Sequence, residues 1–275
     1  MSGSTLRALV EAGASLASGP TALPWPVVDA HAHMGPTGVF YIPTPDAASM
    51  VAMMDRLGFA MTGFAPHLAI GSDYRQGNDL AAEAVRRFPG RFFAYVTVNP
   101  HYVDDLLSEL RRGFDELGCV AIKLHPTMND YAVSDPRCAA IWQFAEERGA
   151  TILTHTWEGD KRCSPEVLGE VAAAHPRAHF LLGHSGGTAS GHRDAVRVAK
   201  QVSNVYLELC NSLVTAPEIA WMVGEVGAER VLFGTDSPWL DPRFMLGKVA
   251  FADLDDEAAR LVMGGNIIRL LDLAV

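Results

Sequence analysis

The stretch VVDAHAHMG, residues 27–35, decides the fold class. Its apolar start is typical of a buried strand. It ends in a His-x-His pair instead of the Gly-rich turn that follows the first strand of an open doubly wound sheet. Seven further runs rich in Val, Ile, Leu and Phe follow it, with helix-compatible stretches between them. The eight runs begin near residues 27, 60, 92, 120, 151, 179, 205 and 231.

The spacing of these runs predicts how the strands are arranged. They recur about every 29 residues, which is the length of one strand, one helix and two short loops. Eight such units form a (β/α)8 barrel, the TIM barrel of the α/β class. We expect helices over residues 103–117, 136–148 and 165–174, and a closing helix over residues 267–271. The prediction is one domain, residues 25–275, preceded by a helix or arm in residues 1–24 that could also contact a second subunit of a homodimer.

Composition and charge restrict the partners of this chain. Its 275 residues include 49% apolar and 20% charged residues, so one large core is feasible. The net charge of −10, without a basic run, disfavours nucleic acid as a partner. No apolar stretch has the length of a membrane span, and Glu11 interrupts the segment that could resemble a signal peptide. We therefore expect a small-molecule substrate.

The four cysteines indicate the compartment. Cys119, Cys138, Cys163 and Cys210 are far apart and include no Cys-x-x-Cys pair, so they are expected to be reduced, buried thiols. Free thiols are typical of the reducing cytosol. The sequence therefore predicts a cytoplasmic protein without disulfides.

The His-x-His pair is the first candidate for chemistry. Alternate residues of a strand share one face, so Asp29, His31 and His33 are expected to project one way, and Ala30 and Ala32 the other. Neutral imidazole is the commonest protein ligand for zinc-like cations. The pattern makes the two histidines candidate metal ligands inside the barrel, although a His-x-His pair alone is a weak signal.

Three further candidate residues stand at the predicted carboxyl ends of other strands. His155 ends the fifth run, His184 ends the sixth, and Asp236 ends the eighth. Active sites of TIM barrels are built at this rim, where residues from different strands converge. Three imidazoles and one carboxylate reach the ligand count of a zinc site that keeps one position open for water.

At this point the sequence resembles the amidohydrolase superfamily, in particular its second family, which includes aminocarboxymuconate semialdehyde decarboxylase. The resemblance spans residues 27–273 and rests on VVDAHAHMG, FFAYVTVNP, GCVAIKLHPT, TILTHTWEG, HFLLGHSGG, VLFGTDSPW and GGNIIRLLDL, in the family order. It implies that His184 stands beside the metal-bound water or the substrate. It also implies one divalent metal held by His31, His33, His155 and Asp236.

The expected reaction is hydrolysis of an amide, ester or lactone bond of a small organic substrate. A divalent metal lowers the pKa of bound water toward neutrality, and Asp236 or His184 can carry the proton to the leaving group. Zinc is the metal we expect first, with manganese and iron as the other choices. The alternative is a nonoxidative decarboxylase of an unsaturated or aromatic carboxylic acid, since the same ligand set serves that branch of the family.

Lys123 ends the fourth predicted strand and has two interpretations. One branch of the superfamily carries a carboxylated lysine here that bridges two metals. Alternatively, Lys123 stays an ammonium group that meets a substrate carboxylate or Asp236. The sequence leaves both open.

Four residues near the strand ends are candidate substrate contacts. His125 shares the face of Lys123, while the others lie in loops that line the mouth of a barrel. Two indoles there suggest a planar ligand, and an arginine suits a substrate carboxylate. The candidates are His125, Trp157, Arg162 and Trp239.

Three other residues are set aside. His67 and His101 follow the second and third strands and are expected to face solvent. Cys210 lies at the rim but lacks a recognisable base, so a nucleophilic thiol mechanism is discounted.

Overall fold

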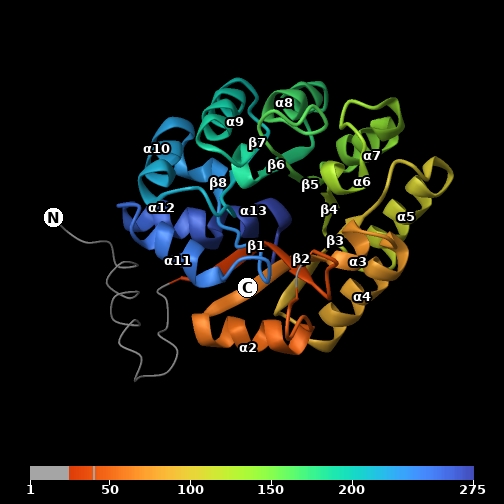
Figure 1. Cartoon of the computed structure of the whole chain (residues 1–275), viewed down its shortest axis with the longest axis horizontal. Helices are drawn as coiled ribbons and strands as arrows, with labels where there is room; N and C mark the ends of the chain where they lie inside the picture. The colour runs from red at the N-terminus through yellow and green to blue at the C-terminus, as the bar shows by residue number, and fades with distance from the viewer. Residues whose placement is uncertain (1–24, 40) are drawn as a thin grey trace.

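The computed structural model describes residues 25–39 and 41–275. The arm predicted in residues 1–24 lies outside the described residues. The strands form one parallel sheet in the order β1-β2-β3-β4-β5-β6-β7-β8. Figure 1 shows the helices as an outer ring around these strands, coloured in chain order around the barrel. The strands are β1 (Val27–Met34), β2 (Phe59–Pro66), β3 (Phe92–Thr97), β4 (Ala121–Leu124), β5 (Thr151–His155), β6 (His179–Gly183), β7 (Val205–Glu208) and β8 (Val231–Leu232).

The sheet closes between β1 and the segment that follows β8. Ala32 forms a parallel bridge with Ser237. The Ala30 amide donates to the Phe233 carbonyl at 3.0 Å, and the His33 amide donates to the Ser237 carbonyl at 2.6 Å. The predicted (β/α)8 barrel is thus confirmed.

Helices connect the strands and cover the outside of the barrel. The predicted helix at residues 165–174 is confirmed with the same bounds. The one expected over residues 136–148 is divided into a 3-10 turn and an α-helix, and the one expected to reach residue 117 ends at Asp115. No helix of the described residues is long and apolar enough to cross a membrane. The helices are α2 (Ala47–Leu57), α3 (His67–Ile70), α4 (Tyr74–Arg87), α5 (Val103–Asp115), α6 (Pro126–Asn129), η1 (Pro136–Cys138), α7 (Ala139–Arg148), α8 (Pro165–Ala174), η2 (His184–Gly186), α9 (Ala189–Gln201), α10 (Ala216–Val226), η3 (Ala228–Arg230), α11 (Pro242–Ala250), α12 (Asp256–Arg260), η4 (Leu261–Gly265) and α13 (Asn266–Leu271).

Apolar side chains pack on both sides of the sheet. Toward the helices, strand residues such as Ile122 join helix residues such as Leu110 in one cluster. Toward the barrel axis, Tyr95 and Leu153 belong to a second cluster, which also includes Ile267 of α13. The barrel interior is therefore a packed core. The candidate site lies above it, at the carboxyl ends of the strands.

The first strand departs from the strict alternation that the sequence predicts. Ala32 packs on the helix side, as expected, whereas Ala30 joins the cluster at the barrel axis. The pairing register between β1 and β2 shifts between Asp29 and Ala32, and such a shift changes the face that a side chain occupies. His31 and His33 nevertheless line the same cavity.

Candidate metal centre

The two histidines of β1 meet Asp236, which lies in the loop after β8. Asp236 Oδ1 is 3.2 Å from His33 Nε2 and 3.8 Å from His31 Nε2. One ligand atom from each of the three residues lies within 4.8 Å of the other two, so the group could hold a metal ion. The structure thus brings these three residues, which are distant in sequence, together at the mouth of the barrel.

Backbone carbonyl groups fix the orientation of two imidazoles. His33 Nδ1 lies 2.9 Å from the Ala65 carbonyl oxygen, and His184 Nδ1 lies 2.6 Å from that of Cys210. A carbonyl oxygen only accepts, so both Nδ1 atoms carry the proton and donate it. In the neutral form of either ring, Nε2 therefore carries the lone pair, with which a histidine binds a metal or accepts a proton.

Lys123 on β4 tests whether this site suits a cation. Its Nζ lies 2.5 Å from His31 Nε2, so an amine already occupies the place next to that ring nitrogen. The side chain is buried, and burial lowers the pKa of Lys123 to about 8. The donor set of His31, His33 and Asp236 therefore fits a divalent cation. Binding of the cation at His31 Nε2 requires that the Lys123 amine moves away from that atom or becomes carboxylated.

Asp236 supplies the negative charge of the cluster. Its backbone has a φ of 58°, a left-handed conformation that Asp tolerates better than most residues, and its amide donates to the His31 carbonyl at 2.7 Å. Burial alone would raise the pKa of Asp236, but its contact with His33 and the neighbouring imidazoles of His184 and His31 hold the pKa below its ordinary value. The side chain is a carboxylate at neutral pH.

His155 stands on the neighbouring wall and is not a member of the His31–His33–Asp236 cluster. Its ring stacks on His125 with centroids 4.2 Å apart, and its centroid is 4.7 Å from that of His184. His155 Nδ1 is buried and has no hydrogen-bond partner among the described residues. Burial lowers the pKa of both His125 and His155 well below the ordinary histidine value. Both rings are neutral, and the unpartnered nitrogen agrees with a role for His155 as a ligand.

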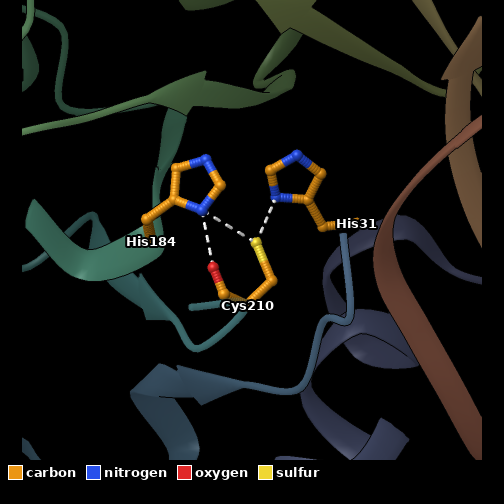
Figure 2. A group of neighbouring side chains, drawn as sticks. All are labelled: His31, His184 and Cys210. Carbon is orange, nitrogen blue, oxygen red and sulfur yellow. Dashed lines mark hydrogen bonds between the residues drawn. The ribbon is translucent and has the colours of Figure 1, made fainter. Parts of the chain in front are cut away.

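A second group of possible ligands shares one histidine with the first. Figure 2 shows Cys210 between His31 and His184, with Sγ 2.9 Å from His31 Nδ1 and 3.2 Å from His184 Nδ1. This group uses the opposite nitrogen of His31. Burial raises the pKa of the Cys210 thiol, and a protonated thiol is a poor ligand. The Nε2 side of His31, with Asp236, therefore suits a cation better than the Nδ1 side.

His67 is buried at the site, so the expectation that it faces solvent is wrong. Its ring stacks on His33 with centroids 5.1 Å apart, and its Nδ1 donates to the Gly35 carbonyl at 2.6 Å. The Trp239 indole N–H donates to His67 Nε2. Burial lowers the pKa of His67 to about 4. By contrast, His101 is exposed, as expected.

A small cavity of about 290 Å³ opens above these groups. That volume lies at the lower end of the range for ligand pockets. The predicted contacts His125, Trp157 and Trp239 all line it, together with apolar residues such as Ile70 and Leu240. The cavity therefore offers aromatic walls to a small planar ligand.

Arg162 is placed differently from the other predicted contacts. Its guanidinium binds Asp160, with Nε 2.9 Å from Oδ1, and Asp130, with Nη1 2.9 Å from Oδ1. It is not among the residues that line the cavity. We therefore assign Arg162 to holding the loop after β5 rather than to binding a substrate carboxylate.

Glu208, the last residue of β7, is a residue of the site that was not predicted from the sequence. This side chain is fully buried, and its Oε2 lies 2.9 Å from His31 Nδ1. A signal for it was present, since Glu208 interrupts the apolar run VYLEL at the position that shares a face with Tyr206. A carboxylate inside a buried strand requires a partner.

A family model described as amidohydrolase matches residues 28–273. The match covers the whole barrel, from β1 to the end of α13. This chain belongs to the amidohydrolase family.

Similar proteins include several decarboxylases. A 2-amino-3-carboxymuconate-6-semialdehyde decarboxylase from Dictyostelium discoideum is 23% identical over 235 residues, covering 71% of this chain and 65% of the relative. The chain thus spans less than two thirds of that relative's length.

Two solved structures share the fold. A 2,6-dihydroxybenzoate decarboxylase complexed with 2,6-dihydroxybenzoate has a TM-score of 0.72 and 17% identity, covering 90% of this chain and 99% of that one. A 5-carboxyvanillate decarboxylase from Novosphingobium aromaticivorans, complexed with manganese and 4-hydroxy-3-methoxy-5-nitrobenzoic acid, has a TM-score of 0.71 and 14% identity, covering 91% of this chain and 97% of that one. At these identities the likeness shows the fold.

Proposed function

We propose that this chain is a metal-dependent decarboxylase that removes CO2, without oxidation, from a small aromatic or unsaturated carboxylic acid. One observation carries the proposal: the cluster of His31, His33 and Asp236 opens into a small cavity walled by two indoles. The three similar proteins named above, all decarboxylases, support this reaction better than the hydrolysis that the sequence analysis placed first. Hydrolysis is therefore the outcome that an assay must exclude.

In this proposal the chain holds one divalent cation at the mouth of the barrel. Zinc is the first choice, because imidazole and carboxylate are among its usual ligands, and manganese or iron would accept the same set. When bound, the cation supplies Lewis-acid polarisation of a substrate oxygen. The proposed ligands are His31, His33, His155 and Asp236.

The reaction breaks the bond between the carboxyl carbon and the ring or alkene carbon. The electron pair of that bond forms a new C–H bond with an incoming proton, and CO2 leaves uncharged. His184 can carry this proton on Nε2, because its Nδ1 is committed to the Cys210 carbonyl. Asp236, an ionised carboxylate beside the same cavity, is the second group that can accept and pass on a proton.

Lys123 is a cation next to the site, with Nζ 2.5 Å from His31 Nε2. The residues that line the cavity include neither Arg nor Lys, so a substrate carboxylate depends on the bound metal for charge compensation. Lys123 is itself buried and does not line the cavity, so we propose that it stays an ammonium group that faces Asp236 rather than the substrate. Carboxylation of Lys123 and a bridged second metal would instead appear as two equivalents of metal in the purified protein.

The walls of the cavity indicate how an acid would be oriented. The rings of His125, His155 and Trp157 are nearly parallel, with an angle of 13° between the first two and 3° between the last two. Aromatic rings prefer offset-stacked or edge-to-face contacts. A flat substrate can thus lie against Trp157 with its carboxylate toward the cation that His33 and Asp236 would hold.

The test combines metal analysis with a substrate panel. The purified protein, loaded with zinc, manganese or iron, is assayed for CO2 release from hydroxybenzoates and muconates, and for cleavage of esters and lactones. We expect CO2 release that stops when the metal is removed and returns when it is restored. Ester or lactone cleavage without CO2 release would instead assign the chain to hydrolysis.

We also propose that the protein acts in the cytoplasm. Its four cysteines are all buried and free, which agrees with a reducing compartment.

A further inference from the structure

Glu208 is a buried carboxylate that the proposed chemistry does not use. Its side chain is fully buried, and it does not line the cavity, so it has no access to a substrate. Its oxygens instead face the groups that support the metal centre. Oε2 lies 2.9 Å from His31 Nδ1, 2.9 Å from Cys210 Sγ and 3.2 Å from the His184 amide, while Oε1 accepts from the Cys210 amide at 2.7 Å.

We propose that Glu208 is a positioning residue that fixes the tautomer and the orientation of His31, and thereby sets the metal affinity of the site. This inference rests on the proposed function, since it assigns His31 as a metal ligand. Carboxylates that accept the second N–H of a ligand histidine raise its basicity and hold its ring in place.

The hydrogen bonds around Glu208 decide which way the proton lies. Backbone amides can only donate, so Glu208 accepts from both the Cys210 and the His184 amides, and the Cys210 thiol donates a third bond. An acceptor of this kind takes the Nδ1–H of His31. Lys123 gives independent support for this tautomer of His31. Its Nζ donates a hydrogen bond to His31 Nε2, so Nε2 carries the lone pair of the ring and Nδ1 carries the proton.

The sequence of β8 and its following loop makes room for this contact. A Cβ added at Gly234 would lie 2.0 Å from Glu208 Oε1 and 2.9 Å from the His31 Cβ. Any side chain at Gly234 would thus push the carboxylate away from the imidazole. The contact between Glu208 and His31 therefore depends on a glycine at position 234. The chain supplies that glycine, which supports a specific role for the contact in the site.

Glu208 also supports the second histidine of the site. His184 and Ser185 have left-handed backbone angles, with φ of 65° and 47°. The Glu208 side chain accepts a hydrogen bond from the His184 amide. The backbone carbonyl of Glu208 accepts another from Ser185 Oγ at 2.8 Å. One residue therefore holds both the ligand His31 and the turn that carries the proposed proton carrier His184, around the Cys210 thiol seen in Figure 2.

The first test is the metal affinity of Glu208→Gln, which keeps the shape of the side chain and removes its charge. We expect the dissociation constant for zinc, measured by competition with a chromophoric chelator, to rise about 10- to 100-fold. Glu109→Gln is the matched control. Glu109 is an equally buried carboxylate that binds Asn78 and Arg112 on the outside of the barrel, and its loss should leave zinc affinity unchanged.

The second test reads the tautomer of His31 directly in the wild-type protein. In metal-free wild-type protein labelled with 15N-histidine, long-range 1H–15N spectra report the tautomer of His31, assigned by its loss in His31→Asn. We expect the Nδ1–H form in wild type and a loss of this preference in Glu208→Gln. An Nε2–H form in wild type, or wild-type zinc affinity in Glu208→Gln, would overturn the inference. Absence of metal binding by wild type would instead overturn the proposed function.

Discussion

The two walls of the cavity are built in different ways. On the β1 side, the imidazoles of His31 and His33 are held at Nδ1 by Glu208 and by a backbone carbonyl, and both Nε2 atoms face Asp236. On the β4–β5 side, the rings stack on one another, and His155 Nδ1 has no hydrogen-bond partner in the described part of the chain. The first wall has the preorganised donors that a cation requires, and the second offers flat surfaces to a substrate.

Removing the charge of Asp236, which faces the two histidines of β1, should have the largest effect. We expect Asp236→Asn to lose both metal affinity and turnover, with the rate falling about 100- to 10,000-fold, since a proton carrier is removed as well as a ligand. The measurement is metal content by elemental analysis together with kcat. Asp241→Asn is the control, because Asp241 binds Arg243 at the start of α11, and it should leave both unchanged. An Asp236→Asn protein with full metal and full activity would remove Asp236 from the site.

His184→Ala separates proton transfer from metal binding. His184 is not in the His31–His33–Asp236 cluster, so we expect the variant to keep its metal while kcat falls about 100- to 10,000-fold. Metal content and kcat are measured on the same preparation. Unchanged turnover would exclude His184 as the proton carrier, and loss of metal would make it a ligand.

Trp157→Ala tests the wall of stacked rings. Its indole packs against Gly187, where an added Cβ would lie 2.3 Å from Trp157 Cε3, so the ring is held in place at the cavity. A stacked aromatic contact contributes roughly 0.5 to 1.5 kcal/mol, so we expect KM for a planar acid to rise up to about 10-fold with the metal content unchanged.

The matched control for that variant is Trp221→Ala, since Trp221 is a partly exposed indole on α10 that does not line the cavity. Its KM should equal that of wild type. A Trp157→Ala enzyme with unchanged KM for every active substrate would mean that Trp157 only packs the loop.

The smallest expected effect concerns the loop that carries Trp157. Hydrogen bonds from Arg162 lower the pKa of Asp160 to about 2, below the value of an unfolded chain. Asp160 thus contributes stability that is present above about pH 4 and is lost as the pH falls through about 2. Asp160→Asn should reduce the free energy of unfolding at neutral pH and flatten its decline in acid, as measured by denaturant unfolding across pH. Equal acid profiles for the two proteins would contradict this account.

The fold was predictable because its signals are local. The eight apolar runs and the proline-started helix α8 (Pro165–Ala174) follow from patterns within a few residues, and the His-x-His pair follows from strand alternation. Because of the register shift in β1, Ala30 faces the barrel axis instead of the helices. His31 and His33 keep the expected orientation toward the cavity. That shift depends on pairing with β2, which no single segment determines.

The supporting groups of the site were not predictable in the same way. His67, Cys210 and Glu208 reach His31 or His33 only after the barrel has closed, across many residues of sequence. Asp236 was predicted as a ligand, yet it lies in a loop beyond β8 rather than at its last residue. Arg162, a plausible anion partner by its loop position, is engaged by two acidic neighbours that only the structure identifies.

The most direct test of a metal centre on the β1 side is anomalous diffraction from crystals grown with zinc, recorded above and below the zinc edge. We expect an anomalous peak in contact with His31 Nε2, His33 Nε2 and Asp236. A peak beside Cys210 on the Nδ1 side of His31, or no peak in crystals of an active enzyme, would contradict it.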